Sequence, residues 1–174
     1  MSPRRGSALR SLGWAIALVA AALGFRATVG SPLVVESATL SPTVLAGEWV
    51  WVWKLRAEAR PGDTVWVRWP GTPLTGAYRV IAVGPAMVAV SEGGRPVVDG
   101  RAARWHETSS GWVEEVGGRR VPVIPGGPSL AATKLPAGQL FLLSDARPIG
   151  GDSRVHGMIR EDAILGAIST SSPD

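Results

Sequence analysis

The chain begins with one apolar run and then changes to a two-residue alternation of apolar and polar side chains. Residues 11–25 are all apolar or small. From Val34 onward, apolar residues recur at every second position in short stretches bounded by Gly and Pro, which is typical of strands. No long amphipathic helix is predicted after the apolar run, so the pattern predicts a mainly β protein. The expected strands are Glu48–Leu55, Thr64–Trp69, Ala77–Val83, Met87–Val90, Gln139–Leu143 and Ala163–Ser169.

The apolar run is short for a membrane-spanning helix, which needs about 20 apolar residues. Arg10 and Arg26 flank it, and their side chains can extend toward the headgroups. A cleaved signal peptide is the alternative, but no convincing cleavage site lies near residues 25–28. Since the basic residues precede the run, we expect an uncleaved anchor with its N-terminus inside. The predicted organisation is a cytoplasmic segment 1–10, a membrane anchor helix 11–30 and an extracytoplasmic β domain 31–174, in a single-pass protein of the cytoplasmic membrane.

Composition excludes several other kinds of protein. The 174 residues include no Cys, so neither a disulfide nor thiol chemistry is available. The net charge of +4 comes without a basic stripe, which argues against nucleic-acid binding. Residues 91–133 are rich in Gly, Arg and Pro and are interpreted as a variable, cap-like insert with short hairpins. Within this insert, a solvated loop is the simplest interpretation of Glu114, Glu115, Arg119 and Arg120.

Three tryptophans alternate with valine in the first predicted strand. Trp49, Trp51 and Trp53 share one face, while Val50 and Val52 share the other. Three indoles on one face are bulky for the core of so small a domain. Trp is enriched at the headgroup level of membranes, and the anchor would hold this strand nearby. We therefore interpret the three tryptophans as membrane-interface residues.

The C-terminal segment carries the most specific motif. Residues 135–168 read LPAGQLFLLSDARPIGGDSRVHGMIREDAILGAI. The positions that matter are Pro136, Gly138, Phe141, Asp145, Arg147, Asp152, Ser153, Arg154, Gly157, Ile164 and Gly166. In this order they resemble the C-terminal signature of the type I signal peptidases, in which a P-x-G-x-x-F strand leads into a G-D-N-R-x-x-S-x-D-S-R-x-x-G loop. The resemblance implies a signal-peptidase-like antiparallel β fold with one N-terminal transmembrane helix.

The resemblance extends to the segment that follows the apolar run, where the family has an S-x-S-M-x-P-T-L motif. Residues 37–44 read SATLSPTV, with Pro42 and Thr43 in register. This register places Thr39 at the nucleophile position. It also places Ser37 where the family has the serine that helps to bind the oxyanion.

The general-base position differs more. The family uses a lysine, whose pKa falls on burial so that a neutral amine can accept the serine proton. Its base segment reads K-R-V-V-G-x-P-G-D, whereas residues 78–85 read YRVIAVGP, which places Tyr78 at the lysine position. Gly150 falls at the position of the serine that orients the base. A phenol has a pKa of about 10 that burial raises further, so we expect Tyr78 to be a poor base.

Four other basic side chains are candidates to replace the lysine. Lys54 and Lys134 are the only lysines, against 16 arginines. His156 lies in the signature loop and is the most plausible substitute, whereas His106 lies in the insert. For each, a surface or structural role is favoured, because a base must first lie within hydrogen-bond reach. No metal and no cofactor are expected.

The remaining signature residues are predicted to be structural. Asp152 and Arg154 are expected to form an ion pair that fixes the loop, as satisfied buried pairs do. Asp145 and Arg147 are assigned to the scaffold in the same way, and so is Pro42.

Two functions compete on this evidence. The favoured one is a catalytically degenerate member of the export pathway that binds signal peptides, exported preproteins or an active signal peptidase at the lipid bilayer, held by strand addition. The other is an active serine-type endopeptidase that cleaves signal peptides with Thr39 as a variant nucleophile. A secreted β domain with a coincidental resemblance is a distant third. Activity does not follow from a fold.

Overall fold

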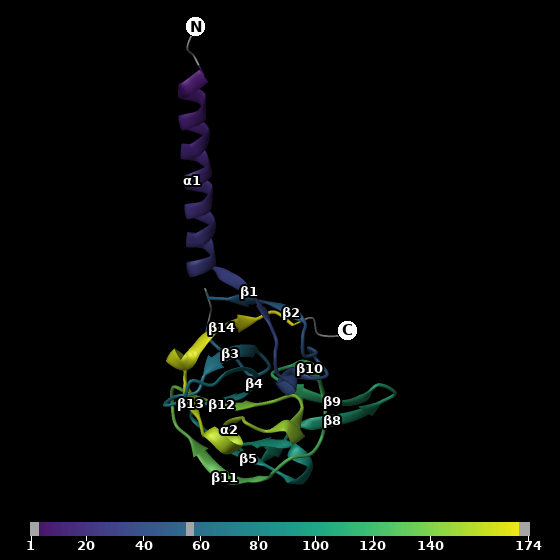
Figure 1. The fold of residues 1–174 in the computed structure, drawn as a ribbon. Helices are drawn as coiled ribbons and strands as arrows, with labels where there is room; N and C mark the ends of the chain where they lie inside the picture. The colour runs from purple at the N-terminus through teal and green to yellow at the C-terminus, as the bar shows by residue number, and fades with distance from the viewer. Residues whose placement is uncertain (1–3, 55–57, 171–174) are drawn as a thin grey trace.

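The computed structural model describes residues 4–54 and 58–170. It contains one long helix, α1 (Arg4–Thr28), which projects from a β domain (Figure 1). Within the described residues, no helix is both long enough and apolar enough to cross a membrane. Large apolar side chains on α1 are exposed, including Trp14 (73%) and Leu18 (69%).

The β domain is antiparallel, as the alternation predicts. Over the described ranges, the main sheet has the strand order β1-β2-β14-β3-β4-β12-β13, and two smaller sheets have the orders β11-β5-β6-β7 and β10-β9-β8. The strands of the main sheet are β1 (Gly30–Val34), β2 (Trp49–Trp53), β14 (Ile164–Ile168), β3 (Thr64–Arg68), β4 (Thr75–Val83), β12 (Gln139–Leu143) and β13 (Ile159–Arg160). Those of the smaller sheets are β5 (Ala86–Val90), β6 (Pro96–Val98), β7 (Arg101–Ala102), β8 (Arg104–Thr108), β9 (Gly111–Val116), β10 (Arg119–Val123) and β11 (Leu130–Leu135).

Short helical turns join these strands around the signature segments. They are η1 (Ala38–Leu40), η2 (Glu92–Gly94), η3 (Arg147–Ile149), α2 (Ser153–His156) and η4 (Glu161–Ala163). Of these, η1 precedes β2, whereas η3 and α2 lie in the loop between β12 and β13. The nucleophile segment and most of the C-terminal signature therefore lie in turns between strands, whereas the base segment lies on β4 itself.

The tryptophan strand is divided between a buried and an exposed face, as its alternation predicts. Val50 and Val52 are buried, whereas Trp49 is 71% and Trp53 is 40% exposed. The ring of Trp51 lies against Phe25 of α1, with centroids 6.4 Å apart. The aromatic face of β2 therefore contacts the C-terminal part of α1.

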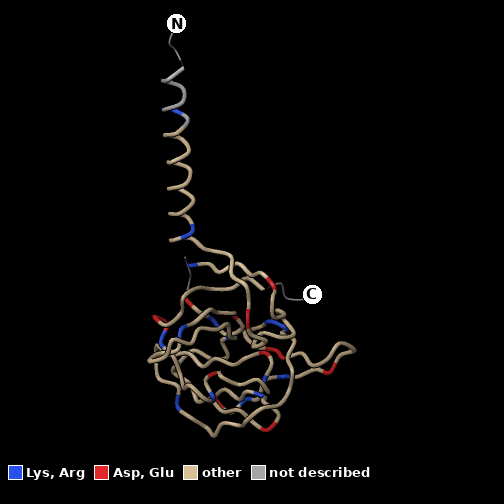
Figure 2. Tube along the Cα trace, viewed as in Figure 1, with Lys and Arg blue, Asp and Glu red and all other residues tan. Residues whose placement is uncertain are grey.

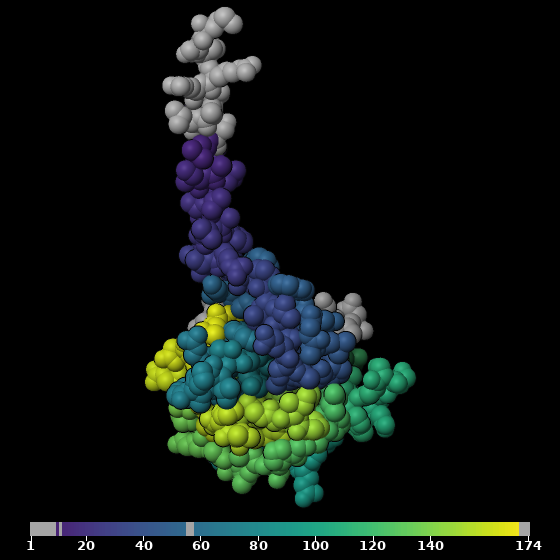
Figure 3. Space-filling view, viewed as in Figure 1, coloured from purple at the N-terminus to yellow at the C-terminus, as the bar shows by residue number. Residues whose placement is uncertain are grey.

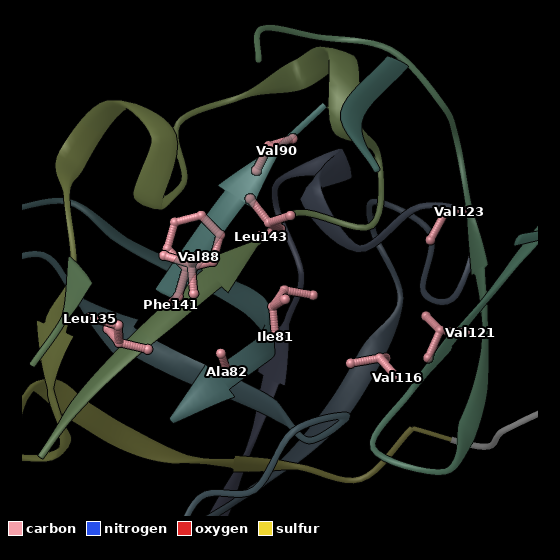
Figure 4. Close-up of a cluster of buried hydrophobic side chains, with 10 residues drawn as sticks. All are labelled: Ile81, Ala82, Val88, Val90, Val116, Val121, Val123, Leu135, Phe141 and Leu143. Carbon is pink, nitrogen blue, oxygen red and sulfur yellow. The ribbon is translucent and has the colours of Figure 1, made fainter. Parts of the chain in front are cut away.

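Residues 91–133 take part in the core. Val116, Val121 and Val123 from this segment pack with side chains of β4, β5, β11 and β12, including Ile81 and Phe141 (Figure 4). Hydrophobic burial therefore ties this segment to the strands that carry the site.

Candidate functional site

Thr39 lies in η1, between the central sheet and the C-terminal loop. Ser37 caps this turn, since its Oγ accepts a hydrogen bond from the Thr39 amide at 3.3 Å. The Thr39 hydroxyl donates to the carbonyl oxygen of Ala77 in β4 at 3.0 Å, and only 5% of the residue is exposed. The Thr39 carbonyl accepts from the amide of Ala146 at 3.3 Å. The fold thus brings the nucleophile position beside the strand that carries the base position.

Tyr78 follows Ala77 in β4, but its side chain leaves the opposite face of the strand. Its ring packs edge-on against Trp69, with centroids 5.3 Å apart. The phenol covers Gly76, where an added Cβ atom would lie 2.9 Å from the hydroxyl oxygen. Among the described residues, no hydrogen bond joins Tyr78 to Thr39, whose hydroxyl proton is directed to a carbonyl instead.

The protonation state of Tyr78 disfavours a role as a base. Burial raises the pKa of the Tyr78 phenol above its ordinary value of 10.0, a contact with Trp69 offsets part of this rise, and the Asp152 carboxylate adds to it. A phenol that stays protonated at neutral pH can donate a hydrogen bond but cannot accept the proton of a nucleophile.

Gly150 lies at the end of η3 in a backbone conformation that only glycine adopts readily, with φ 67° and ψ −153°. A Cβ atom at this position would meet nothing within 4 Å. A serine here would therefore have room, but its backbone would be strained.

Arg79, the residue after Tyr78, anchors the loop that follows β12. Its guanidinium binds Asp145 through two hydrogen bonds, Nε to Oδ1 at 3.2 Å and Nη2 to Oδ2 at 2.7 Å. The hydroxyl of Thr43 donates to the same carboxylate at 2.7 Å. Arg79 and Asp145 are both buried, so burial is compensated by a two-point ion pair. Pro42 lies exposed directly before Thr43.

Asp152 is the hub of the second half of the loop. Its carboxylate caps α2 by accepting from the Arg154 amide at 3.1 Å, and the Arg154 guanidinium donates to both of its oxygens at 2.8 Å. The amide and hydroxyl of Ser144 each donate to it at 3.0 Å. Burial by itself would raise the pKa of Asp152, but the hydrogen bonds from Arg154 and Ser144 and the Arg154 charge outweigh it and hold the pKa below 3.8.

The partner of Arg147 was not predicted. Its Nη2 donates to Glu114 Oε1 at 2.6 Å, and both side chains are fully buried. The other Glu114 oxygen accepts from Trp105 Nε1 at 2.7 Å. The interpretation of Glu114, Glu115, Arg119 and Arg120 as a solvated loop is therefore wrong, because all four lie on β9 or β10 and Glu114 is buried, although the other three are partly or fully exposed. The signal that was overlooked is the two-residue spacing from Glu114 to the buried Val116, which places both on one face of β9.

Comparison with known proteins identifies the family of the chain. The model of one family, described as signal peptidase, peptidase S26, matches residues 8–172. The chain belongs to the S26 signal peptidase family. Among solved structures, a signal peptidase I from Enterococcus faecalis V583 is 18% identical, with a TM-score of 0.47 over 66% of this chain and 98% of that one. No curated protein matches the chain.

The structure also shows where the side chains that could replace the family's lysine lie in this chain. Lys54 Nζ donates to the carbonyl oxygens of Arg26 and Ala27 at 3.1 and 3.4 Å, at the C-terminal end of α1. Lys134 is exposed on β11, opposite Met87 of β5. Among the described residues, neither lysine side chain therefore makes a hydrogen bond with Thr39.

The two histidines differ in their distance from the signature loop. His106 lies on β8, where its Nε2 is 3.0 Å from Glu115 Oε1. His156 is exposed at the end of α2, and its ring stacks on Trp69 with centroids 5.1 Å apart. Trp69 also contacts Tyr78, so His156 reaches the base position only through an intervening indole.

Three cavities of the protein lie outside the candidate site. One of about 930 Å³ is bordered by β4, the β6–β7 turn and the β9–β10 turn. Two others of about 420 Å³ lie beside the end of β14 and on the β8–β9 hairpin. None of these three cavities is lined by Thr39, Tyr78 or Gly150.

Proposed function

We propose that this protein binds signal peptides or other segments of exported proteins without cleaving them. Membership of the S26 family supports the substrate class. The observation that carries the loss of activity is the place of the two lysines, because one caps α1 and the other is exposed on β11. Peptide hydrolysis by this family's chemistry needs a neutral amine beside the nucleophile.

The remaining groups do not replace that amine. The Thr39 hydroxyl donates to a main-chain carbonyl, which cannot become a proton carrier. Burial raises the pKa of Tyr78, so its phenol keeps its proton. In serine hydrolases the loss of the nucleophile or the base lowers kcat by roughly 10⁴–10⁶-fold.

Binding is proposed to use the part of β4 that has no partner strand on its β12 side within the described ranges. On its β12 side, the paired residues run from Val83 to Arg79, where the partner is Leu143. The stretch from Thr75 to Tyr78 therefore has no strand partner on that side among the described residues, and one of its carbonyls holds the Thr39 hydroxyl. An extended peptide can add to such an edge through main-chain hydrogen bonds.

We propose further that α1 attaches the protein to the cytoplasmic membrane, with the β domain on the outer side. The segment between Arg10 and Arg26 carries no charged residue (Figure 2). It extends away from the β domain with its apolar side chains exposed (Figure 3). Trp49 and Trp53 are exposed on β2, and Trp53 is paired with Gly30, two residues after α1 ends, so both suit the headgroup region. An active signal peptidase in the same membrane is a further proposed partner.

The test is a paired binding and cleavage experiment on the full chain in detergent. A fluorescent model preprotein would be incubated with wild-type protein and with Thr39→Ala. We expect binding by both proteins and cleavage by neither. Cleavage by the wild type that Thr39→Ala abolishes would overturn the proposal and establish a threonine-variant signal peptidase. Folded protein that neither binds nor cleaves would also overturn it.

Membrane attachment has its own test. The protein would be mixed with phospholipid vesicles and centrifuged through a density gradient, beside a Leu18→Glu variant and the surface control Glu107→Gln. We expect wild type and Glu107→Gln to float with the vesicles, and Leu18→Glu to stay behind, because a charge in the apolar stretch costs about 2.5–3.5 kcal/mol. Wild-type protein that stays behind would refute attachment.

A further inference from the structure

An arginine-rimmed cleft lies apart from Thr39, Tyr78 and Gly150, none of which lines it. It measures about 930 Å³ and lies between Ile81 of β4, the β6–β7 turn and the β9–β10 turn. This volume is near the upper end of the roughly 300–1,000 Å³ found for ligand sites. The cleft therefore has room for several side chains of a partner.

The rim of this cleft is rich in positive charge. Four arginines line it, Arg101, Arg104, Arg119 and Arg120, against two carboxylates, Asp99 and Glu115. The Asp99 carboxylate already has a hydrogen-bond partner, because its Oδ1 accepts from the amide of Met87 at 2.8 Å.

Three of the four guanidinium groups, those of Arg101, Arg104 and Arg119, retain donors for a ligand. Arg104 is 82% exposed and only loosely paired, 3.9 Å from Glu115. Arg119 is 51% exposed, although it pairs with Asp63 at 2.8 Å. Arg101 is exposed and makes no ion pair among the described residues. Since each guanidinium carries five N–H donors, these pairs leave capacity for further acceptors.

The floor of the cleft is apolar. Ile81, Pro96 and Val116 are all buried, and they come from three different strands. An apolar floor beneath a cationic rim suits a ligand with alternating apolar and acidic groups. An extended peptide has this arrangement, because successive side chains point to opposite sides.

We propose that this cleft binds an acidic polypeptide segment in extended conformation. Charge complementarity supports the choice, since arginine binds carboxylates through two parallel hydrogen bonds. The cleft is bordered on one side by β6 and β7, which belong to the sheet that contains β5 and β11, and on the other by the β9–β10 turn. The headgroup of an anionic lipid is the alternative occupant that the test distinguishes. This proposal holds whether or not the protein cleaves peptides at Thr39.

The test uses fluorescence anisotropy of a fluorescein-labelled peptide of four Glu-Val repeats, added to the full chain in detergent. We expect binding that weakens at least tenfold in the variant Arg101→Gln/Arg104→Gln. The matched control is Arg68→Gln/Arg160→Gln, which removes two exposed arginines outside the cleft and should leave the Kd within twofold. A Lys-Val peptide of the same length should not bind.

Other outcomes would overturn the inference. Equal loss in the control variant would indicate a general charge effect rather than a site. Absence of peptide binding, combined with flotation on anionic vesicles that depends on Arg101 and Arg104, would assign the cleft to lipid. Because both substituted arginines are exposed, thermal unfolding should match the wild type. Thr39→Ala should bind the Glu-Val peptide normally, which separates this site from the one beside β4.

Discussion

The loop between β12 and β13 is held by ion pairs of buried side chains, whereas the three reactive positions, Thr39, Tyr78 and Gly150, form none among the described residues. Three arginine–carboxylate pairs hold the loop, Arg79–Asp145, Arg147–Glu114 and Arg154–Asp152, at 2.6–2.8 Å with side chains at most 2% exposed. The reactive positions hold a hydroxyl bonded to a carbonyl, a protonated phenol and a glycine whose backbone conformation would strain other residues.

This difference shows that the scaffold of the site does not depend on its chemistry. Each buried arginine is satisfied by a carboxylate or a backbone carbonyl, as burial of a charge requires. Arg147, for example, also donates to the carbonyl oxygens of Gly94 and Ser144. None of these bonds involves Thr39 or Tyr78. The ion pairs of this scaffold are therefore formed independently of the residues at the nucleophile and base positions.

The largest expected effect comes from breaking a buried pair. Arg147→Ala should lower the free energy of unfolding by about 3–5 kcal/mol, because it leaves the Glu114 carboxylate buried without its counter-ion. Urea denaturation followed by tryptophan fluorescence measures this loss.

Arg160→Ala is the control, since Arg160 pairs with Asp162 at 3.6 Å with both side chains 76% exposed. It should cost less than about 1 kcal/mol. Equal losses in the two variants would show that the scaffold gains nothing from the buried pair.

The next effect concerns the glycine at the position of the family's serine. Gly150→Ala should lower the free energy of unfolding by about 1–3 kcal/mol, because φ 67° with ψ −153° strains any residue that has a Cβ. Ile149→Ala, at an exposed neighbour, should change it by less than about 0.5 kcal/mol. A Gly150→Ala variant as stable as wild type would mean that a serine is readily accommodated there.

A smaller effect should appear in the pH dependence of stability. The folded state holds the pKa of Asp152 below its ordinary value of 3.8, so the stabilisation by its carboxylate is complete above that pH. It is lost as the pH falls through the lower, folded pKa. The difference in unfolding free energy between wild type and Asp152→Asn should therefore be constant from pH 7 to pH 5 and shrink below about pH 4. A constant difference down to pH 3 would contradict this assignment.

The sequence predicts local features of the molecule far better than distant pairings. Alternation correctly predicts the antiparallel strands and the split of β2 into a valine face and a tryptophan face. The pair Asp152–Arg154 is equally predictable, because the two residues are two positions apart on one turn. Glu114 is 33 residues from Arg147, and Asp145 is 66 residues from Arg79. Such pairs depend on strand order, which no spacing in the sequence specifies. The same holds for the Thr39–Ala77 contact, across 38 residues.

The smallest expected effect tests whether the phenol at the base position has any chemical role. Tyr78→Phe removes one hydroxyl and keeps the ring that packs on Trp69. We expect the free energy of unfolding to change by less than about 1.5 kcal/mol, the typical net value of one hydrogen bond. Preprotein binding should be unchanged, because the ring still covers Gly76. The measurement is anisotropy of a labelled preprotein beside a cleavage assay. A wild type that cleaves and a Tyr78→Phe variant that does not would place the phenol in the proton pathway, and the proposal of binding without cleavage would then fail.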